Sequence, residues 1–342
     1  MTAREIVRAR LNHKGTDITP YTVEFEAKLY QKLTEYYKDE NWESKKLRKY
    51  MTHFSVDTVK MEPVDDVYSK DGYGALWRMD QVPWHLETPT LANPDFEGID
   101  FPKAERFVSA ILQTKQEGIR MFNADNEHYR LIDMGWGIFE HSWRMRGFEN
   151  ALVDMLADED FYSELTQKIT DIYIAMLQAC EDIPADAFVF GDDWGEQRGI
   201  IMGADTWRKF IKPCWAKIYT EVHRQGKLAL HHSCGSIAEI YGDLIEIGMD
   251  CHESVQPEAA NMAPELLKKK WGDRMSFWGC LGTQSILFFG SPCEIKAEVL
   301  RLHNLFKRDG GYLLAPTKPL QDEMPIENAI AVVEAFSELS NV

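Results

Sequence analysis

The residues best suited to chemistry lie in one short stretch, LALHHSCGSI, at positions 228–237. Its first residues are apolar and predict a buried strand, and Gly235 permits a sharp turn directly afterwards. Ser236 and Glu239 have the spacing of a capping box, which predicts a helix after the turn. His232 and Cys234 are two positions apart, so they share one face of the strand end. An imidazole and a thiolate that converge are good zinc ligands, although a buried histidine beside a packed cysteine is the common alternative.

Polar residues follow four other predicted strands in the same way. One strand of the set ends at Asp192-Asp193, another at His252, Glu253 and Gln256, another at Cys280 and Gln284, and the last at Lys318. In parallel α/β folds the carboxyl ends of the strands meet on one face, where active sites are built. We therefore expect these side chains to share a site. The alternative explanation is that they are polar only because loops generally are. Individually, an aspartate could cap a turn, Glu253 could form an ion pair and Cys280 could be a small core residue.

The elements that must position these residues alternate regularly in the second half of the chain. Strands are predicted at AFVFG, LALHH, MDCHES, MSFWGC and GYLLAP, and each is followed by a helical pattern. Five such units, with room for three upstream, predict a (β/α)8 barrel. An open doubly wound sheet is the alternative, but the chain has no glycine-rich phosphate loop of the G-x-G-x-x-G type.

The first hundred residues differ from this pattern. Helices are predicted from Thr2, with Glu5 completing a capping box, and over residues 22–38. Residues 55–100 are rich in Asp, Gly and Pro and predict a hairpin or covering loop that carries Trp77 and Trp84. Residues 131–147 predict a strand followed by an irregular Gly- and Trp-rich region. We expect a single domain over 1–342, with helices and covering loops in 1–100 and the main barrel in 101–342.

Composition limits the partners and the compartment. The formal net charge is −17, which argues against nucleic acid and anionic membranes as partners. The six cysteines form no C-x-x-C pair, and no apolar run is long enough for a membrane span or a signal peptide. We expect a cytoplasmic protein with free thiols, and a homodimer is an assembly that the sequence leaves open.

Several motifs together resemble the uroporphyrinogen decarboxylase superfamily. They are GDDWGEQRG at 191–199, HSCGSI at 232–237, VQPEA at 255–259, FWGCLGTQ at 277–284, GGYLLAP at 310–316 and PIEN at 325–328. The resemblance implies a (β/α)8 barrel and one of two chemistries, either decarboxylation without a cofactor or zinc-dependent methyl transfer involving corrinoid proteins or coenzyme thiols. The arginine-rich segment that grips porphyrinogen carboxylates in the decarboxylases is not found near the start of this chain. The opening AREIVRARLNHK is instead similar to the methyltransferase branch.

The same resemblance implies roles for particular residues. His232 and Cys234 match the H-x-C zinc ligands of the methyltransferase branch, and the family's third ligand, a cysteine, falls at or beside Lys318 here. We therefore expect Cys280 or Glu253 to complete the ligand set. Among the branches, the DDWG and FWG-x-x-T-Q stretches look most like the enzymes that remove methyl groups from methoxylated aromatics.

These observations favour a zinc-dependent methyltransferase that moves a methyl group from a methyl ether to the Co(I) corrinoid of a partner protein. Asp193, or failing it Asp192, is the expected proton donor to the leaving oxygen. The expected substrate contacts come from aromatic and polar residues around the site: Trp77, Trp84, Trp194, Trp278, Gln256, Gln284 and Lys318. A decarboxylase and a barrel subunit without catalysis remain the alternatives, and bound zinc would separate them from the methyltransferase.

Overall fold

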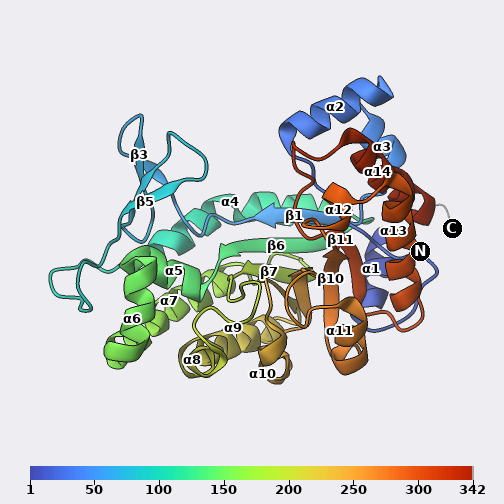
Figure 1. Cartoon of the computed structure of the whole chain (residues 1–342). Coiled ribbons are helices and arrows are strands. Elements are labelled where there is room, and N and C mark those ends of the chain that lie inside the picture. Colours follow the sequence, from blue (N-terminus) through green and yellow to red (C-terminus); the bar gives the residue numbers. More distant parts are fainter. Residues whose placement is uncertain (341–342) are drawn as a thin grey trace.

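A computed structural model describes residues 1–340 as a curled parallel sheet wrapped in helices (Figure 1). The sheet has seven strands, and each pairs in parallel with its neighbours in chain order. The strands are β1 (Met51–Ser55), β6 (Tyr129–Trp136), β7 (Ala187–Gly191), β8 (Leu228–His232), β9 (Cys251–Val255), β10 (Ser276–Leu281) and β11 (Tyr312–Pro316). The expected α/β barrel architecture is therefore present, with all carboxyl ends of the strands on one face.

The sheet differs from the predicted eight-stranded barrel at one place. Between β11 and β1 the chain contributes an extended segment, residues 20–26, instead of an eighth strand. This segment runs parallel to β11 and the residues after it, through bridges from Tyr21 to Leu314 in β11 and from Phe25 to Leu320 beyond it. No bridge joins it to β1 within residues 1–340. The helix expected over 22–38 consequently begins only at Ala27 (α2, Ala27–Tyr37), because pairing with β11 holds the residues before it extended.

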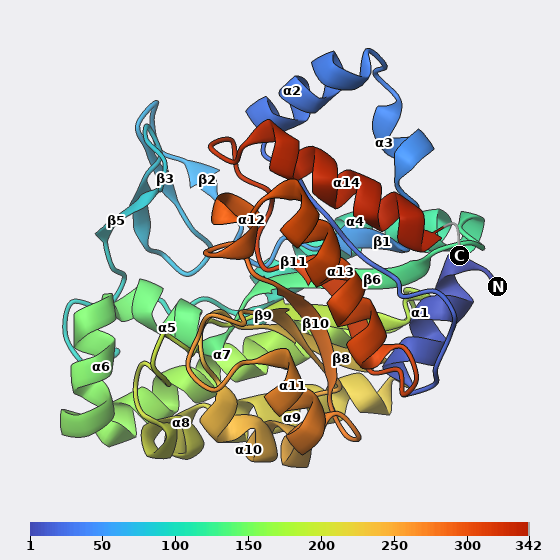
Figure 2. The ribbon, with the colours of Figure 1, turned by 45° about the vertical axis from the view of Figure 1, so that its right-hand side comes forward.

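Helices cover the outside of the sheet (Figure 2). Those of the main layer are α4 (Ala104–Ala124), α7 (Glu159–Ala179), α8 (Ala204–Phe210), α9 (Lys212–Arg224), α10 (Tyr241–Ile247), α11 (Pro264–Trp271), α12 (Ile286–Phe289), α13 (Pro292–Phe306) and α14 (Ile326–Ser340). Each buries one apolar stripe, as Leu165, Ile169 and Met176 do on α7. None of the helices within residues 1–340 is long and apolar enough to cross a membrane.

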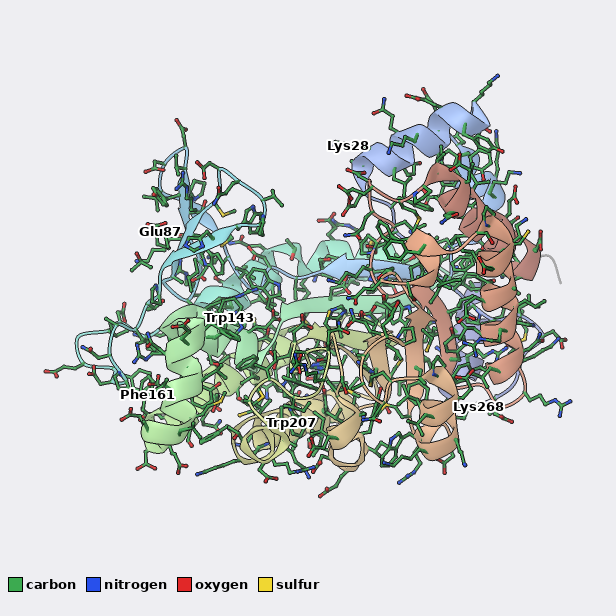
Figure 3. The ribbon with its side chains drawn as sticks, in the orientation of Figure 1. Lys28, Glu87, Trp143, Phe161, Trp207 and Lys268 are labelled. Carbon is green, nitrogen blue, oxygen red and sulfur yellow. The ribbon has the colours of Figure 1, made fainter. Side chains whose placement is uncertain are left out.

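Two parts of the chain project from this body. Helices α2 and α3 (Trp42–Lys46) pack near α14, and a four-stranded antiparallel sheet lies apart from them. That small sheet comprises β2 (Glu62–Pro63), β3 (Tyr68–Lys70), β4 (Leu76–Arg78) and β5 (His85–Thr88). Lys28 on α2 and Glu87 on β5 mark the two projections in Figure 3. The hairpin expected around Trp77 and Trp84 is confirmed as the β4–β5 pair.

Two of the three predicted capping boxes are present in the structure. The capping boxes Thr2–Glu5 on α1 (Ala3–Leu11) and Ser291–Glu294 on α13 are confirmed. The one at Ser236 is wrong, because the Ser236 hydroxyl donates to the carbonyl of Ala260 and only a short 3-10 turn, Ala238–Ile240, precedes α10. The region after β6 is not irregular either, because it forms α5 (Ile138–Arg146) and α6 (Phe148–Ala157).

Candidate metal centre

Three potential ligands converge at the carboxyl ends of β7 and β8. Asp193, His232 and Cys234 each offer one ligand atom, and these atoms lie within 4.8 Å of one another. The Cys234 Sγ is 3.4 Å from His232 Nε2, and the Asp193 Oδ1 is 3.6 Å from the same nitrogen. All three side chains are half-buried, so a ligand can reach them. A thiolate, an imidazole and a carboxylate fit zinc, and three protein ligands leave a fourth position for another molecule.

Glu253 lies on the other side of the His232 ring. Its carboxylate contacts Nδ1, the nitrogen that faces away from Cys234, so it orients the imidazole and does not join the cluster. Burial by itself lowers the pKa of His232, but the adjacent Glu253 outweighs it and raises that pKa well above its usual value. A metal that binds Nε2 must therefore displace a proton, which makes metal affinity dependent on pH.

Backbone contacts hold the two ligand loops together. The Cys234 N–H donates to Asp193 Oδ1 at 2.7 Å, and the Ser236 N–H donates to the Glu196 carbonyl at 2.8 Å. Gly195 and Gly235 pack against each other so tightly that a Cβ on Gly195 would lie 2.5 Å from the Cys234 carbonyl oxygen. Gly235 also has a φ of +72°. Neither position therefore accommodates a side chain.

Gln256, an expected substrate contact, lies under the turn that follows β8. Its side chain is 5% exposed, and its amide oxygen accepts the Gly235 N–H at 2.8 Å. It thus supports the turn that carries Cys234. No substrate contact is needed to explain its environment.

The two adjacent aspartates have separate environments. Asp192 is fully buried and accepts hydrogen bonds from the backbone N–H groups of Phe139 and Glu140 and from the indole N–H groups of Trp194 and Trp215, at 2.8–3.1 Å. Burial raises the pKa of Asp192 to about 6. This carboxylate joins the first turn of α5 to the end of β7. Asp193 alone faces the ligand cluster.

Trp194 is likewise an internal residue. Its ring is fully buried and stacks on His231 with the ring centroids 4.3 Å apart, and Trp207 packs against it from α8. The expectation that Trp194 lines an open substrate pocket is therefore not supported, because protein side chains surround its ring.

Cys280 is not near the cluster. It is fully buried, and it has a φ of +69° beside a register shift between Trp278 and Gly279. This left-handed backbone breaks the strand alternation that would place Cys280 on the same side as Trp278. Burial raises the pKa of the thiol, and the charges that act on it are Arg301, Glu265 and Glu298 of the helix layer. The sequence expectation of Cys280 as a ligand assumed a regular strand.

Glu140 is a candidate that the sequence did not single out. It lies in the first turn of α5, where its backbone N–H binds Asp192, and its pKa is raised to about 7 by burial and by the nearby charges of Asp192 and Asp193. Arg144, one turn later at 3.7 Å, opposes that shift. The available signal is that Glu140 lies four residues after the end of β6, in a stretch that the sequence pattern predicts as irregular.

A cavity of about 730 Å³ reaches the cluster at His232, inside the curl of the sheet. Residues from all seven strands line it, including His232 and Glu253 at one side. Trp278 lines it as well and donates its indole N–H to Thr22. Lys318 lies at its exposed rim. Side chains usually fill the interior of such a barrel, so an open volume in this size range indicates space for a small molecule.

Three expected substrate contacts lie elsewhere. Trp77 is buried in the small sheet with its indole N–H on Asp71. Trp84 is 48% exposed, and Gln284 is an exposed loop residue whose backbone binds Glu258. None of the three lines the cavity.

This chain matches a known protein family. The family model for uroporphyrinogen decarboxylase matches residues 85–339. The chain belongs to the uroporphyrinogen decarboxylase family. This is a family of enzymes, and its other members supply the relatives described next.

Curated relatives are similar at low identity. Uroporphyrinogen decarboxylase from Geobacter sulfurreducens is 26% identical over 278 residues, which cover 77% of this chain and 75% of that protein. The one from Bacillus cytotoxicus is 26% identical over 225 residues, covering 60% of each chain. The one from Nocardia farcinica is 34% identical over 96 residues, covering 28% of this chain and only 26% of its own length.

A solved structure covers nearly the whole chain. A methyltransferase from Methanosarcina mazei superposes with a TM-score of 0.71 over 99% of both chains, at 17% sequence identity. At that identity the similarity establishes a shared fold.

Proposed function

We propose that this member of the uroporphyrinogen decarboxylase family is a zinc-dependent methyltransferase. The observation that carries the proposal is the convergence of Asp193, His232 and Cys234 beside an internal cavity. Asp193, His232 and Cys234 would hold the ion, which when bound supplies a Lewis acid for the oxygen that loses its methyl group. The proposed donor is a methyl ether, in particular a methoxylated aromatic, and the proposed acceptor is the Co(I) corrinoid of a partner protein.

A residue of the protein would supply the proton that the leaving oxygen needs. The ether oxygen gains negative charge as the methyl group leaves, so a nearby proton donor lowers the barrier. We assign this role to Glu140, because it lies close enough to the cluster for the charges of Asp193 and His232 to act on it, and its pKa is raised to about 7. Asp193 suits it less well, because it is a proposed ligand of the ion and already accepts the Cys234 N–H.

A decarboxylase is the second candidate, because the curated relatives carry that name. Uroporphyrinogen has several carboxylates and would need an excess of cationic groups around it. The cavity instead has more acidic than basic residues on its lining. The acids are Glu24, Glu43, Asp133 and Glu253, and the bases other than histidine are Arg48, Lys49 and Lys318. This balance favours a substrate with little negative charge.

Metal content combined with a methyl-transfer assay tests the proposal. The purified protein should bind about one zinc, and His232→Ala, Cys234→Ser and Asp193→Asn should each lose most of it while keeping their far-UV circular dichroism. Cys293→Ser, at an exposed cysteine on α13, and Cys280→Ser are matched controls that should keep zinc. Full zinc in all three ligand variants would exclude this centre.

The assay itself separates the two candidate functions. Zinc-loaded protein should methylate a Co(I) corrinoid from a methoxyarene, and Glu140→Gln should lower turnover by roughly 100-fold with zinc retained. A substrate with a more acidic leaving phenol should restore most of that loss. Decarboxylation of uroporphyrinogen by metal-free protein, without methyl transfer, would support the decarboxylase instead.

A further inference from the structure

A second histidine–carboxylate pair lines the cavity. His53 on β1 places Nδ1 at 3.1 Å from both carboxylate oxygens of Asp133 on β6. Ser55, opposite Asp133 in the strand register, donates its hydroxyl to the same carboxylate at 3.2 Å. The His53 and Asp133 side chains are 41% and 28% exposed although both belong to the barrel sheet. They are exposed because they border the cavity.

This pair repeats the arrangement of His232 and Glu253. In both, a carboxylate on the next strand of the sheet binds Nδ1 of the imidazole, on β1 and β6 in one case and on β8 and β9 in the other. At His232, the remaining nitrogen faces Cys234 and Asp193. At His53, no group within residues 1–340 forms a hydrogen bond with the remaining nitrogen, Nε2.

The tautomer of His53 follows from its partner. A carboxylate is only an acceptor, so a neutral His53 carries its proton on Nδ1 and presents a lone pair at Nε2. Such a nitrogen accepts a hydrogen bond from a hydroxyl group. A carboxylate on the substrate would suit the cavity less well, because acids outnumber lysine and arginine on its lining.

The placement of the pair suits a remote part of the substrate. In the proposed reaction the methyl group must face the acceptor at the carboxyl face, so the rest of the molecule extends into the cavity. Strand β7 separates the His53–Asp133 pair from β8, and its Val189 lines the cavity between them. A ring held at the cluster would therefore direct a substituent across Val189 toward His53.

We propose that the His53–Asp133 pair selects substrates bearing a hydroxyl group remote from the methyl ether, which donates a hydrogen bond to His53 Nε2. The proposal rests on the proposed function and assigns its substrate class, a hydroxylated methoxyarene. Sites built to bind a hydroxyl discriminate strongly against analogues that lack it, because the polar group that the bound substrate covers is then left unpaired.

The test compares 4-methoxyphenol with 4-methylanisole as methyl donors to Co(I) corrinoid. Wild-type protein should favour the phenol by roughly 100-fold or more in kcat/KM. His53→Leu should reduce this ratio to within a few-fold of one and keep its zinc, since His53 is outside the ligand cluster. His85→Leu, at an exposed histidine of β5, is the matched control and should keep the wild-type ratio.

Asp133→Asn distinguishes recognition from a merely structural role. An asparagine amide can donate to Nδ1, which moves the imidazole proton to Nε2 and turns His53 from acceptor to donor. The preference should then shift from 4-methoxyphenol toward 4-methoxyacetophenone, whose carbonyl only accepts. An unchanged phenol preference in His53→Leu, with active wild-type protein, overturns this inference alone. Wild-type protein that transfers no methyl group from any of these donors overturns the proposed function and this inference with it.

Discussion

At the residue scale, the adjacent aspartates after β7 illustrate how burial separates two identical side chains. Asp192 is fully buried with four N–H donors around it, whereas Asp193 is exposed to the ligand cluster. A buried acceptor of several hydrogen bonds serves stability, because each donor it satisfies would otherwise be unpaired. An accessible carboxylate beside a thiol and an imidazole can serve metal binding.

Asparagine substitutions at the two positions should therefore have opposite effects. Asp192→Asn replaces one acceptor oxygen with an amide NH2 group, a donor that faces other N–H donors, so it should lower the free energy of unfolding by about 1–3 kcal/mol and leave zinc bound. Asp193→Asn should release zinc and change stability little when both proteins are metal-free. Urea unfolding with chelator, together with zinc analysis, measures both. Equal loss of zinc in the two variants would contradict this division.

The residues that the sequence located well are those whose position follows from the strand end alone. His232, Cys234 and Asp193 needed only a regular strand and a turn to be placed together, although Asp193 was expected as a proton donor and lies in the ligand cluster. Cys280 was an alternative to Glu253 for the remaining ligand because it also follows a strand, but a left-handed backbone turns it toward the helices. Glu140 and His53 were missed because their roles depend on partners distant in sequence, Asp192 and Asp133, which a single strand pattern does not reveal.

At the scale of elements, a buried histidine fastens the Cys234 turn to β9. His252 has Nδ1 at 2.7 Å from the Tyr241 hydroxyl of α10 and Nε2 at 2.9 Å from the carbonyl of Ser233. A neutral ring satisfies both, accepting from the tyrosine and donating to the carbonyl. Burial lowers the pKa of His252 to about 4.

This pKa predicts how the contact responds to acid. The ordinary histidine pKa is about 6.5, so between pH 6.5 and 4 the unfolded chain binds more protons and the folded state loses stability as the pH falls. His252→Gln does not titrate, so its stability deficit relative to wild type should shrink by about 2–3 kcal/mol between pH 7 and pH 4.5. Urea unfolding of both proteins with chelator provides the measurement. Parallel pH profiles would mean that His252 is not buried as a neutral ring. His231 is also buried with a lowered pKa, but it is present in both proteins, so its contribution cancels in the difference between their stabilities.

Element prediction succeeded where local pattern and tertiary pairing agreed. Five strand–helix units after residue 186 were anticipated, and all five strands are present as β7 to β11. The first half was harder because pairing overrode local preference. Residues 20–26 join the edge of β11 instead of starting a helix, and α5 forms because Asp192 satisfies its first N–H groups. Neither partner can be identified from the segment itself.

At the scale of the whole molecule, the incomplete sheet leaves room inside the barrel. Seven strands and one extended segment surround the cavity of about 730 Å³. Barrels of this type normally fill the interior with branched side chains in layers. Here a polar lining replaces part of that filling, so the interior can serve binding.

Filling this space should impair substrate binding more than stability. Val189→Phe adds a ring to the cavity side of β7, where it meets open volume instead of packed atoms. We expect KM for methoxyarenes to rise about 10-fold or more, zinc to remain bound, and the free energy of unfolding to change by less than about 1 kcal/mol, below the usual cost of overpacking a filled core. Steady-state kinetics and urea unfolding test this. A large loss of stability with unchanged KM would show that the space is not used by substrate.

The contact between Gly195 and Gly235 has a consequence for how this protein can diversify. The two residues are on different loops, and the backbone of each loop fills the space that a Cβ on the other loop's glycine would need. In a library that randomises both codons and selects for retained metal, glycine should dominate at each position independently of the residue at the other, because a second substitution cannot create the missing room. New specificities are therefore more accessible through the cavity lining than through the loops that carry the ligands.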